Sequence, residues 1–223
     1  MFDFDGTVLD TESACYTSWS ELYARFGCRL EPELWARVVG SPYGGFDPWR
    51  HLEEKLGRAL DREALEVERR AREAELIARQ PLRPGVVELL RAAKEAGLGI
   101  GLATSSRRDW VERHLAPHGI RDAFEAIATA DDVERLKPDP ALYTLAVRRL
   151  GVRPEEAIAI EDSPTGALGA VRAGLACVVV PNDLTEKYDF SMAHALWPTL
   201  AGRTVTDLER VWSAVRLGSG APG

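Results

Sequence analysis

The sequence predicts an α/β fold: a parallel sheet flanked by helices, with an α-helical segment inserted after the first strand. Over residues 80–223, short apolar runs rich in β-branched residues alternate with helical patterns, which is typical of βαβ units. Residues 12–79 instead contain helical patterns without a strand-like run. The chain has 223 residues, 45% of them hydrophobic, which suffices for one large domain or for a core with a small insertion.

The predicted strands are apolar runs of the kind found in buried parallel sheets. They cover 98–103, 124–128, 157–160 and 175–180. The helices between them have ordinary start and stop residues: Pro84 and Gly97 around 86–96, Asp139–Pro140 before a helix ending at Gly151, and Ser163–Pro164 before one ending at Gly174. Near the C-terminus, Thr206 and Glu209 predict a capping box before Val211.

The longest helical pattern of the insert covers residues 60–78. Its apolar residues recur at steps of three and four: Leu60, Ala64, Val67, Ala71, Ala74 and Ala78. This stripe predicts an amphipathic helix that buries the stripe against its neighbours. A coiled coil is the less favoured interpretation, because the stripe is short and mostly alanine.

These patterns predict two domains: a core of residues 1–11 and 80–223, and a helical domain of residues 12–79. The first strand ends near Asp3, and Met1 and Phe2 alone precede it. A central strand is expected to bring more apolar residues, so native residues added upstream are expected to raise the melting temperature.

Charge and cysteine content restrict the classes of function. The net charge of −7 and a sequence pI of about 5.3 argue against nucleic acid as a partner. No apolar run reaches the roughly 20 residues that span a bilayer, and no signal peptide is evident. The cysteines Cys15, Cys28 and Cys177 match no zinc pattern, so a reduced, cytoplasmic protein without a membrane partner is expected.

Chemically active side chains follow several predicted strands. They are Asp3 and Asp5 before Gly6, then Thr104, Ser105 and Ser106, then Lys137, and finally Glu161 and Asp162. Each group alone has a simpler explanation: Asp3 and Asp5 fit a solvated turn, and Ser106 with Asp109 fits a helix N-cap, with or without a phosphate. Because ligands of open α/β sheets bind beyond the carboxyl ends of the strands, we expect these side chains to share one site.

The same motifs carry a resemblance to a known family. Asp-x-Asp-Gly-Thr at 3–7, Ala-Thr-Ser-Ser at 103–106, Lys-Pro-Asp-Pro at 137–140 and Glu-Asp-Ser-Pro-Thr-Gly at 161–166 occur in this order. In this the chain resembles the haloacid dehalogenase superfamily, most of all the branch of phosphoglycolate phosphatase and β-phosphoglucomutase. The resemblance covers the whole chain and implies a Rossmann-like core with a helical cap domain.

The resemblance also implies roles for individual residues. Asp3 would be the nucleophile that forms an aspartyl-phosphate, and Asp5 the general acid and base. Phosphate would be bound by Thr104, Ser105, Ser106 and Lys137. The implied cofactor is Mg²⁺, and its ligands would be Asp3, the backbone carbonyl of Asp5, Glu161 and Asp162. Phosphoryl transfer chiefly needs such positioning and charge neutralisation.

The expected activity is a phosphatase acting on a small phosphorylated metabolite, with a β-phosphoglucomutase-like mutase as the alternative. The mutase has a histidine where this chain has Cys15. It also has an arginine after a glycine-led cap loop, whereas residues 40–49 contain no lysine or arginine here. A binding protein without catalysis is disfavoured, because a binder has no need for both a nucleophile and an acid.

Residues 40–49 are the candidate substrate-selecting loop, with Tyr43 as the predicted substrate contact. Its aromatic residues Phe46 and Trp49 either line the substrate or pack within the cap. Cys15 and Trp19 are expected to face the same cleft. Phosphoglycolate, sugar phosphates and nucleoside monophosphates all remain open as substrates, and the expected assembly is a monomer or weak homo-oligomer.

Overall fold

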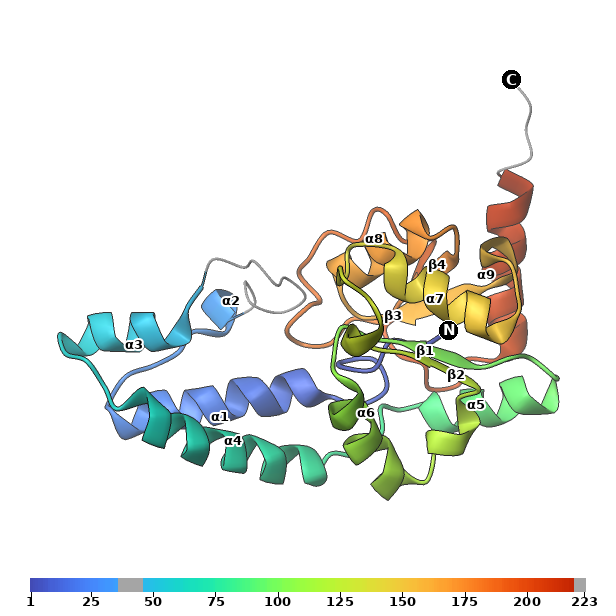
Figure 1. The fold of residues 1–223 in the computed structure, drawn as a ribbon. Coiled ribbons are helices and arrows are strands. Elements are labelled where there is room, and N and C mark those ends of the chain that lie inside the picture. The colour runs from blue at the N-terminus through green and yellow to red at the C-terminus, as the bar shows by residue number, and fades with distance from the viewer. Residues whose placement is uncertain (36–45, 219–223) are drawn as a thin grey trace.

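A computed structural model describes residues 1–35 and 46–218. In Figure 1 the strands lie among helices on one side, while helices α1 to α4 extend away from them on the other. The strands are β1 (Gly101–Ala103), β2 (Ala126–Ala128), β3 (Ile158–Glu161), β4 (Ala176–Val179) and β5 (Ala195–Leu196). All paired strands are parallel, which confirms the predicted fold class. The short β5 was not predicted.

The N-terminal segment joins β1 and β3 into one layer. Phe2 bridges Leu102 on one side and Ile160 on the other, both in parallel. The Phe2 amide donates to Gly101 O at 2.8 Å, and the Asp3 amide donates to Ile160 O at 3.0 Å. The order across the sheet is therefore β2, β1, the Phe2 segment, β3, β4 and β5, with Asp3 at the end of the central segment.

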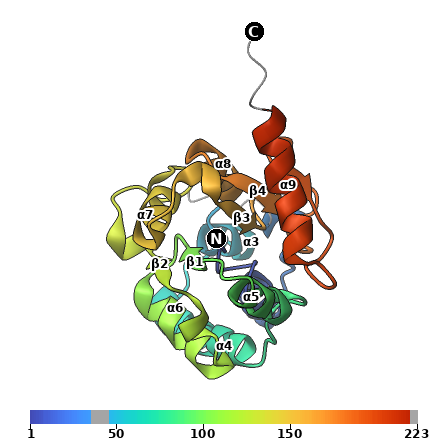
Figure 2. The same ribbon diagram turned by 90° about the vertical axis from the view of Figure 1, so that its right-hand side faces the viewer.

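Helices cover both faces of this sheet (Figure 2). They are α5 (Val86–Glu95), α6 (Arg108–Leu115), α7 (Ala141–Leu150), α8 (Pro164–Arg172) and α9 (Val205–Gly218), together with short 3-10 turns at Ala116–His118, Arg121–Ala123, Ala130–Asp132 and Pro154–Glu156. Apolar residues of α5, α6 and α9 share one core cluster with Leu102 and Ile160. Those of α7 and α8 share a second cluster with Ala103 and Ala159. Neighbouring strand residues thus point to opposite faces, which gives three layers.

Away from the cavity described below, the helix ends follow the predicted signals with one exception. The Ser163 side chain caps α8 through the Gly166 amide at 3.1 Å. At α9, however, the capping pair is Thr204 and Asp207, whose side chains each accept from the other's backbone amide. The prediction of a box at Thr206 and Glu209 was wrong by two residues, because overlapping Thr-x-x-acid patterns occur here and only the first lies at the helix start.

The inserted segment is helical, as predicted. Its helices are α1 (Thr11–Arg25), α2 (Pro32–Trp35), α3 (Pro48–Leu56) and α4 (Arg62–Ala78), with no strand in the described part of residues 11–79. A separate core cluster holds them together, built on Trp19, Leu22, Tyr23, Leu30, Trp35 and Leu52. The exact domain boundaries at residues 12 and 79 stay a prediction.

The apolar stripe predicted for α4 does not face the core. Val67 is 67% exposed, and the alanines of the stripe are exposed as well. The helix instead buries Arg69 and Ile77, which are 7% and 0% exposed. The prediction was wrong because alanine buries little apolar area, so the larger side chains on another face of α4 decide its packing.

None of the helices in the described ranges has the length and apolar character needed to cross a bilayer.

Candidate active site

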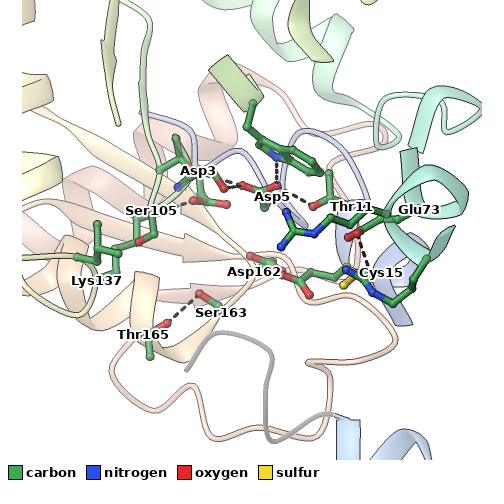
Figure 3. A pocket seen from close by; sticks show the side chains of 17 residues that line it. Asp3, Asp5, Thr11, Cys15, Glu73, Ser105, Lys137, Asp162, Ser163 and Thr165 are labelled. Carbon is green, nitrogen blue, oxygen red and sulfur yellow. Dashed lines mark hydrogen bonds and ion pairs between the residues drawn. The ribbon is translucent and has the colours of Figure 1, made fainter. Parts of the chain in front are cut away.

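A cavity of about 690 Å³ lies between the sheet edge and the inserted helices α1 and α4. Its core side is formed by Asp3, Asp5, Thr104, Ser105, Ser106, Lys137 and Asp162. Figure 3 shows several of these side chains turned toward a common space. All the predicted site residues therefore line one cavity, except Glu161, which contacts Lys137 without lining it, and Tyr43, which lies outside the described residues.

The parallel sheet explains this convergence. Asp3 ends the central segment, Thr104 follows β1, and Asp162 follows β3. The carboxyl ends of parallel strands meet at one edge, so residues far apart in sequence become neighbours there. Lys137 reaches the same edge from the loop before α7.

Asp3, Glu161 and Asp162 form a buried cluster of carboxylates. Each offers an oxygen within 4.8 Å of the others, and the three residues are 6%, 0% and 2% exposed. Lys137 donates to Asp3 and, at 2.6 Å, to Glu161. One ammonium thus pairs with two of the three carboxylates, so the buried cluster holds more acidic groups than basic ones.

The ionisation of the cluster reflects this imbalance. Burial is the main cause that raises the pKa of Asp3 to about 8, with Lys137 opposing it. Burial likewise raises the pKa of Asp162 well above its ordinary range, and the nearby charges of Asp3 and Glu161 add to the effect. Oxygen donors with excess negative charge suit a hard divalent cation, so this acidic group could hold a metal ion.

Two supporting residues were missed by sequence reasoning. The Asn182 amide donates to Asp162 Oδ2 at 2.8 Å, and the Tyr143 hydroxyl donates to Glu161. Asn182 lies just past β4, so the rule of carboxyl strand ends could have found it. Tyr143 carries no such signal, because it is a buried residue within α7.

Asp5 is held by donors on both of its oxygens. Oδ1 accepts from Thr11 Oγ1 at 2.8 Å and from Trp110 Nε1 at 2.9 Å. Oδ2 accepts from Ser106 Oγ at 2.6 Å and from Thr104 Oγ1 at 3.4 Å. These contacts fix the carboxylate at the cavity wall. The hydrogen bond from Trp110 to Asp5 was not predicted from the sequence.

Ser106 is not the N-cap of the following helix. Helix α6 begins at Arg108, and the Arg108 amide donates to the Asp131 carboxylate at 2.7 Å rather than to Ser106. The Ser106 amide donates to Thr104 Oγ1 at 3.0 Å, while its hydroxyl is engaged by Asp5. The interpretation of Ser106 with Asp109 as a simple cap was therefore wrong, because Asp5 offers the Ser106 hydroxyl a charged acceptor.

The insert side of the cavity differs in part from expectation. Cys15 lines it as expected. Trp19 does not, since it is buried in the core of the insert against Trp49, with ring centroids 4.9 Å apart. Phe46 also packs on that core, so the packing alternative holds for Phe46 and Trp49.

Four charged residues on the insert side were missed. Glu12, Arg69, Arg70 and Glu73 all line the cavity. Arg69 pairs with Glu66 at 2.8 Å and with Glu73 at 2.9 Å. Glu12 precedes Cys15 by three residues on α1, so the two side chains lie on one face of the helix. This spacing could have predicted that Glu12 lies beside the cavity.

At the carboxyl edge of this parallel sheet, acids, a lysine and hydroxyls lie beneath a helical insert. This arrangement is typical of one class of hydrolytic α/β enzymes. Within that class, the chain belongs to the haloacid dehalogenase-like hydrolases, whose family model matches residues 1–174.

Curated relatives agree with this assignment. A Bacillus subtilis (strain 168) protein named "Putative phosphatase YhcW" is 47% identical over 194 residues, which is 85% of this chain and 88% of that protein. The validoxylamine A 7'-phosphate phosphatase of Streptomyces hygroscopicus subsp. limoneus is 33% identical, covering 80% of this chain and 83% of its own length.

Among solved structures, CbbY from Rhodobacter sphaeroides in complex with phosphate superposes with a TM-score of 0.73 at 30% identity. The match covers 93% of this chain and 97% of that one. Together these findings confirm the predicted family and the predicted class of enzyme, a phosphoric monoester hydrolase.

Proposed function

We propose that the protein is a Mg²⁺-dependent phosphatase that hydrolyses a small phosphorylated metabolite through an aspartyl-phosphate on Asp3. The observation that supports this most is the position of Asp3, which shares the cavity with Asp5 and belongs to the buried cluster of Glu161 and Asp162. A nucleophile and a proton donor thus face the same space.

The steps use this chain's own side chains. The Asp3 carboxylate attacks phosphorus, and the leaving oxygen takes a proton from Asp5 as its bond to phosphorus breaks. Asp5, now ionised, then takes a proton from water as that water attacks phosphorus and the bond from phosphorus to the Asp3 oxygen breaks. Inorganic phosphate leaves, and Asp3 and Asp5 return to their starting states.

The carboxylates of Asp3, Glu161 and Asp162 and the backbone carbonyl of Asp5 would hold Mg²⁺. The ion supplies the positive charge that lets an anionic ester approach an anionic nucleophile. Lys137 adds a second positive charge beside Asp3. Thr104, Ser105 and Ser106 would orient the phosphoryl oxygens with hydroxyl and amide hydrogens.

A mutase is the alternative, and the insert side of the cavity argues against it. A mutase must bind a second phosphate of its bisphosphate intermediate. Arg69 is paired with Glu66 and Glu73, and Arg70 pairs with Glu66 at 2.6 Å. Cys15 offers a thiol where the mutase has a histidine. Tyr43 stays a predicted substrate contact, and the cytoplasmic location and the monomeric or weakly oligomeric state likewise stay predictions.

Phosphate release from p-nitrophenyl phosphate tests the proposal. With Mg²⁺ present, we expect turnover by the wild type, and chelation should abolish it. Asp3→Asn should lower turnover by at least about 10³-fold, because the amide is no nucleophile. Asp109→Asn is the matched control, since Asp109 is an exposed residue of α6. Full activity in Asp3→Asn, or after chelation, would contradict the mechanism.

The mutase alternative has its own assay. Conversion of β-glucose 1-phosphate to glucose 6-phosphate in the presence of the bisphosphate would identify it. We expect release of inorganic phosphate instead.

A further inference from the structure

Trp110 reaches the acid–base residue from an element outside the four motifs. It lies on α6, and its indole Nε1 donates to Asp5 Oδ1 at 2.9 Å. The ring is half-buried and lies against the His114 imidazole, with centroids 4.3 Å apart. His114 Nδ1 in turn lies 2.8 Å from the Trp110 carbonyl oxygen. The indole is thus held in place from within its own helix.

We infer that Trp110 is a positioning residue that holds the Asp5 carboxyl group by Oδ1 and thereby leaves Oδ2 as the oxygen that passes the proton to the leaving group. The inference rests on the proposed function, in which Asp5 protonates the leaving oxygen.

The chemistry of the four donors around Asp5 carries this inference. A hydroxyl can donate or accept, so Thr11, Thr104 and Ser106 can each turn to suit a protonated oxygen. An indole N–H can only donate. A proton on Oδ1 could be donated to Thr11, but the indole would then face a hydroxyl oxygen, which accepts a hydrogen bond more weakly than a carbonyl oxygen. A proton on Oδ2 meets no such conflict, because the Ser106 hydroxyl at 2.6 Å can rotate and accept it.

The two oxygens also lie in different surroundings. Oδ2 faces Thr104 and Ser106, which follow β1 at the edge where the phosphoryl group is proposed to bind. Oδ1 faces Thr11, at the start of α1, and Trp110. The indole therefore orients the carboxyl group so that Oδ2 lies on the phosphate side. When the bond from phosphorus to the leaving oxygen breaks, that proton passes from Oδ2 to the leaving oxygen, and Asp5 becomes a carboxylate held by all four donors.

Leaving-group dependence tests the inference. Trp110→Phe keeps an aromatic ring but removes the N–H. The substrates are p-nitrophenyl phosphate, whose phenolate departs without a proton, and an alkyl phosphate such as glycerol 1-phosphate, whose alkoxide needs one. We expect kcat/KM for the alkyl phosphate to fall about 10- to 100-fold, as for a misplaced acid, and kcat/KM for p-nitrophenyl phosphate to change less than about threefold.

Trp212→Phe is the matched control. Its indole also donates a hydrogen bond, to Glu155 O at 2.8 Å, but it lies on α9 and does not line the cavity. It should leave the ratio of the two kcat/KM values unchanged. An equal fall for both substrates in Trp110→Phe, or no fall for either, would overturn the inference. Retained Mg²⁺-dependent turnover of p-nitrophenyl phosphate would at the same time leave the proposed function standing.

A second measurement does not depend on whether Trp110→Phe folds. In protein labelled with ¹⁵N-tryptophan, Asp5→Ala removes the acceptor of one indole N–H. We expect one indole cross-peak to shift and to exchange faster with solvent. If every indole cross-peak stayed in place, Trp110 would not be bound to Asp5 in solution and the inference would fail.

Discussion

Gly6 combines two requirements that no other residue type meets. Its φ of 83° lies in the left-handed region, and a Cβ at this position would collide with the Asp162 carboxylate. The turn after Asp5 can therefore approach the proposed metal ligand closely only with glycine.

For Gly6→Ala we expect at least a tenfold loss of kcat/KM and a higher Mg²⁺ concentration for half-maximal activity, because Asp162 must move. Gly57→Ala is the control, since Gly57 also has a positive φ of 65° but no atom within 4 Å of its would-be Cβ. The Gly57→Ala variant therefore introduces only backbone strain, of about 1–2 kcal/mol, and no steric collision. If both variants raised the Mg²⁺ concentration for half-maximal activity equally, the close approach of Gly6 to Asp162 would have no role in Mg²⁺ activation.

Glu12 links stability to pH. Burial, together with the negative charges of Asp5, Asp10 and Glu73, raises the pKa of Glu12 to about 8 from an ordinary 4.5. The folded protein therefore binds this proton more tightly than the unfolded chain. The resulting stabilisation is complete below about pH 4.5 and is lost as the pH rises through about 8.

Glu12→Gln removes this titration. We expect the melting temperature of the variant, relative to wild type, to be higher at pH 8 than at pH 5. Glu186→Gln, which changes an exposed residue, should show no such dependence. A difference that stays constant from pH 5 to pH 8 would show that Glu12 does not titrate in this window.

At the scale of single elements, α4 shows how an ion-pair network can override an apolar stripe. The buried Arg69 guanidinium donates to Glu66, Glu73 and, at 3.0 Å, to Ser18 of α1, and it lies 4.8 Å from the Trp19 ring centre. These contacts tie α4 to α1. The insert side of the cavity consists of Glu12 and Cys15 on α1 and Glu73 on α4. Its shape depends on the contacts of Arg69 that hold these two helices together.

Arg69→Met is expected to lower the free energy of unfolding by about 2–4 kcal/mol, because it removes the ion-pair partner of the partly buried Glu73 and leaves Glu66 only the exposed Arg70. Arg70→Met is the matched control: Arg70 shares Glu66 as a partner, but its side chain is 73% exposed, and an exposed pair contributes about 1 kcal/mol at most. Urea denaturation measures both. If both variants lost the same free energy of unfolding, burial of the Arg69 ion pairs would add no stability beyond that of an exposed pair.

At the scale of the whole molecule, the cavity joins two unlike walls. The core wall is suited to a phosphate, whereas the insert wall offers Glu12 and Glu73 and two arginines that are paired with glutamates. A leaving group that carries its own negative charge would meet the Glu73 carboxylate and two arginines that are already paired, and the like-charge repulsion makes this unfavourable.

We therefore expect monophosphates of neutral, hydroxylated alcohols to be better substrates than phosphoglycolate, by about tenfold or more in kcat/KM. Parallel assays of glycerol 1-phosphate and phosphoglycolate measure this. Glu73→Gln should narrow the difference in kcat/KM between the two substrates, because it removes the repelling charge. If the wild type preferred phosphoglycolate, the expected repulsion at the insert side of the cavity would be contradicted.

The sequence by itself determined the fold class, the helical insert and most of the core side of the site. Apolar runs, caps and strand-end motifs are local signals, and parallel strands bring the ends that carry Asp3, Thr104 and Asp162 to one edge whatever the remaining packing is. The tertiary structure alone decided which face of α4 is buried, and it alone brought Trp110 to Asp5 and Tyr143 to Glu161. An indole N–H, a phenol or a buried guanidinium has no fixed role in a local pattern, because its function depends on which acceptor the rest of the chain places within hydrogen-bonding distance.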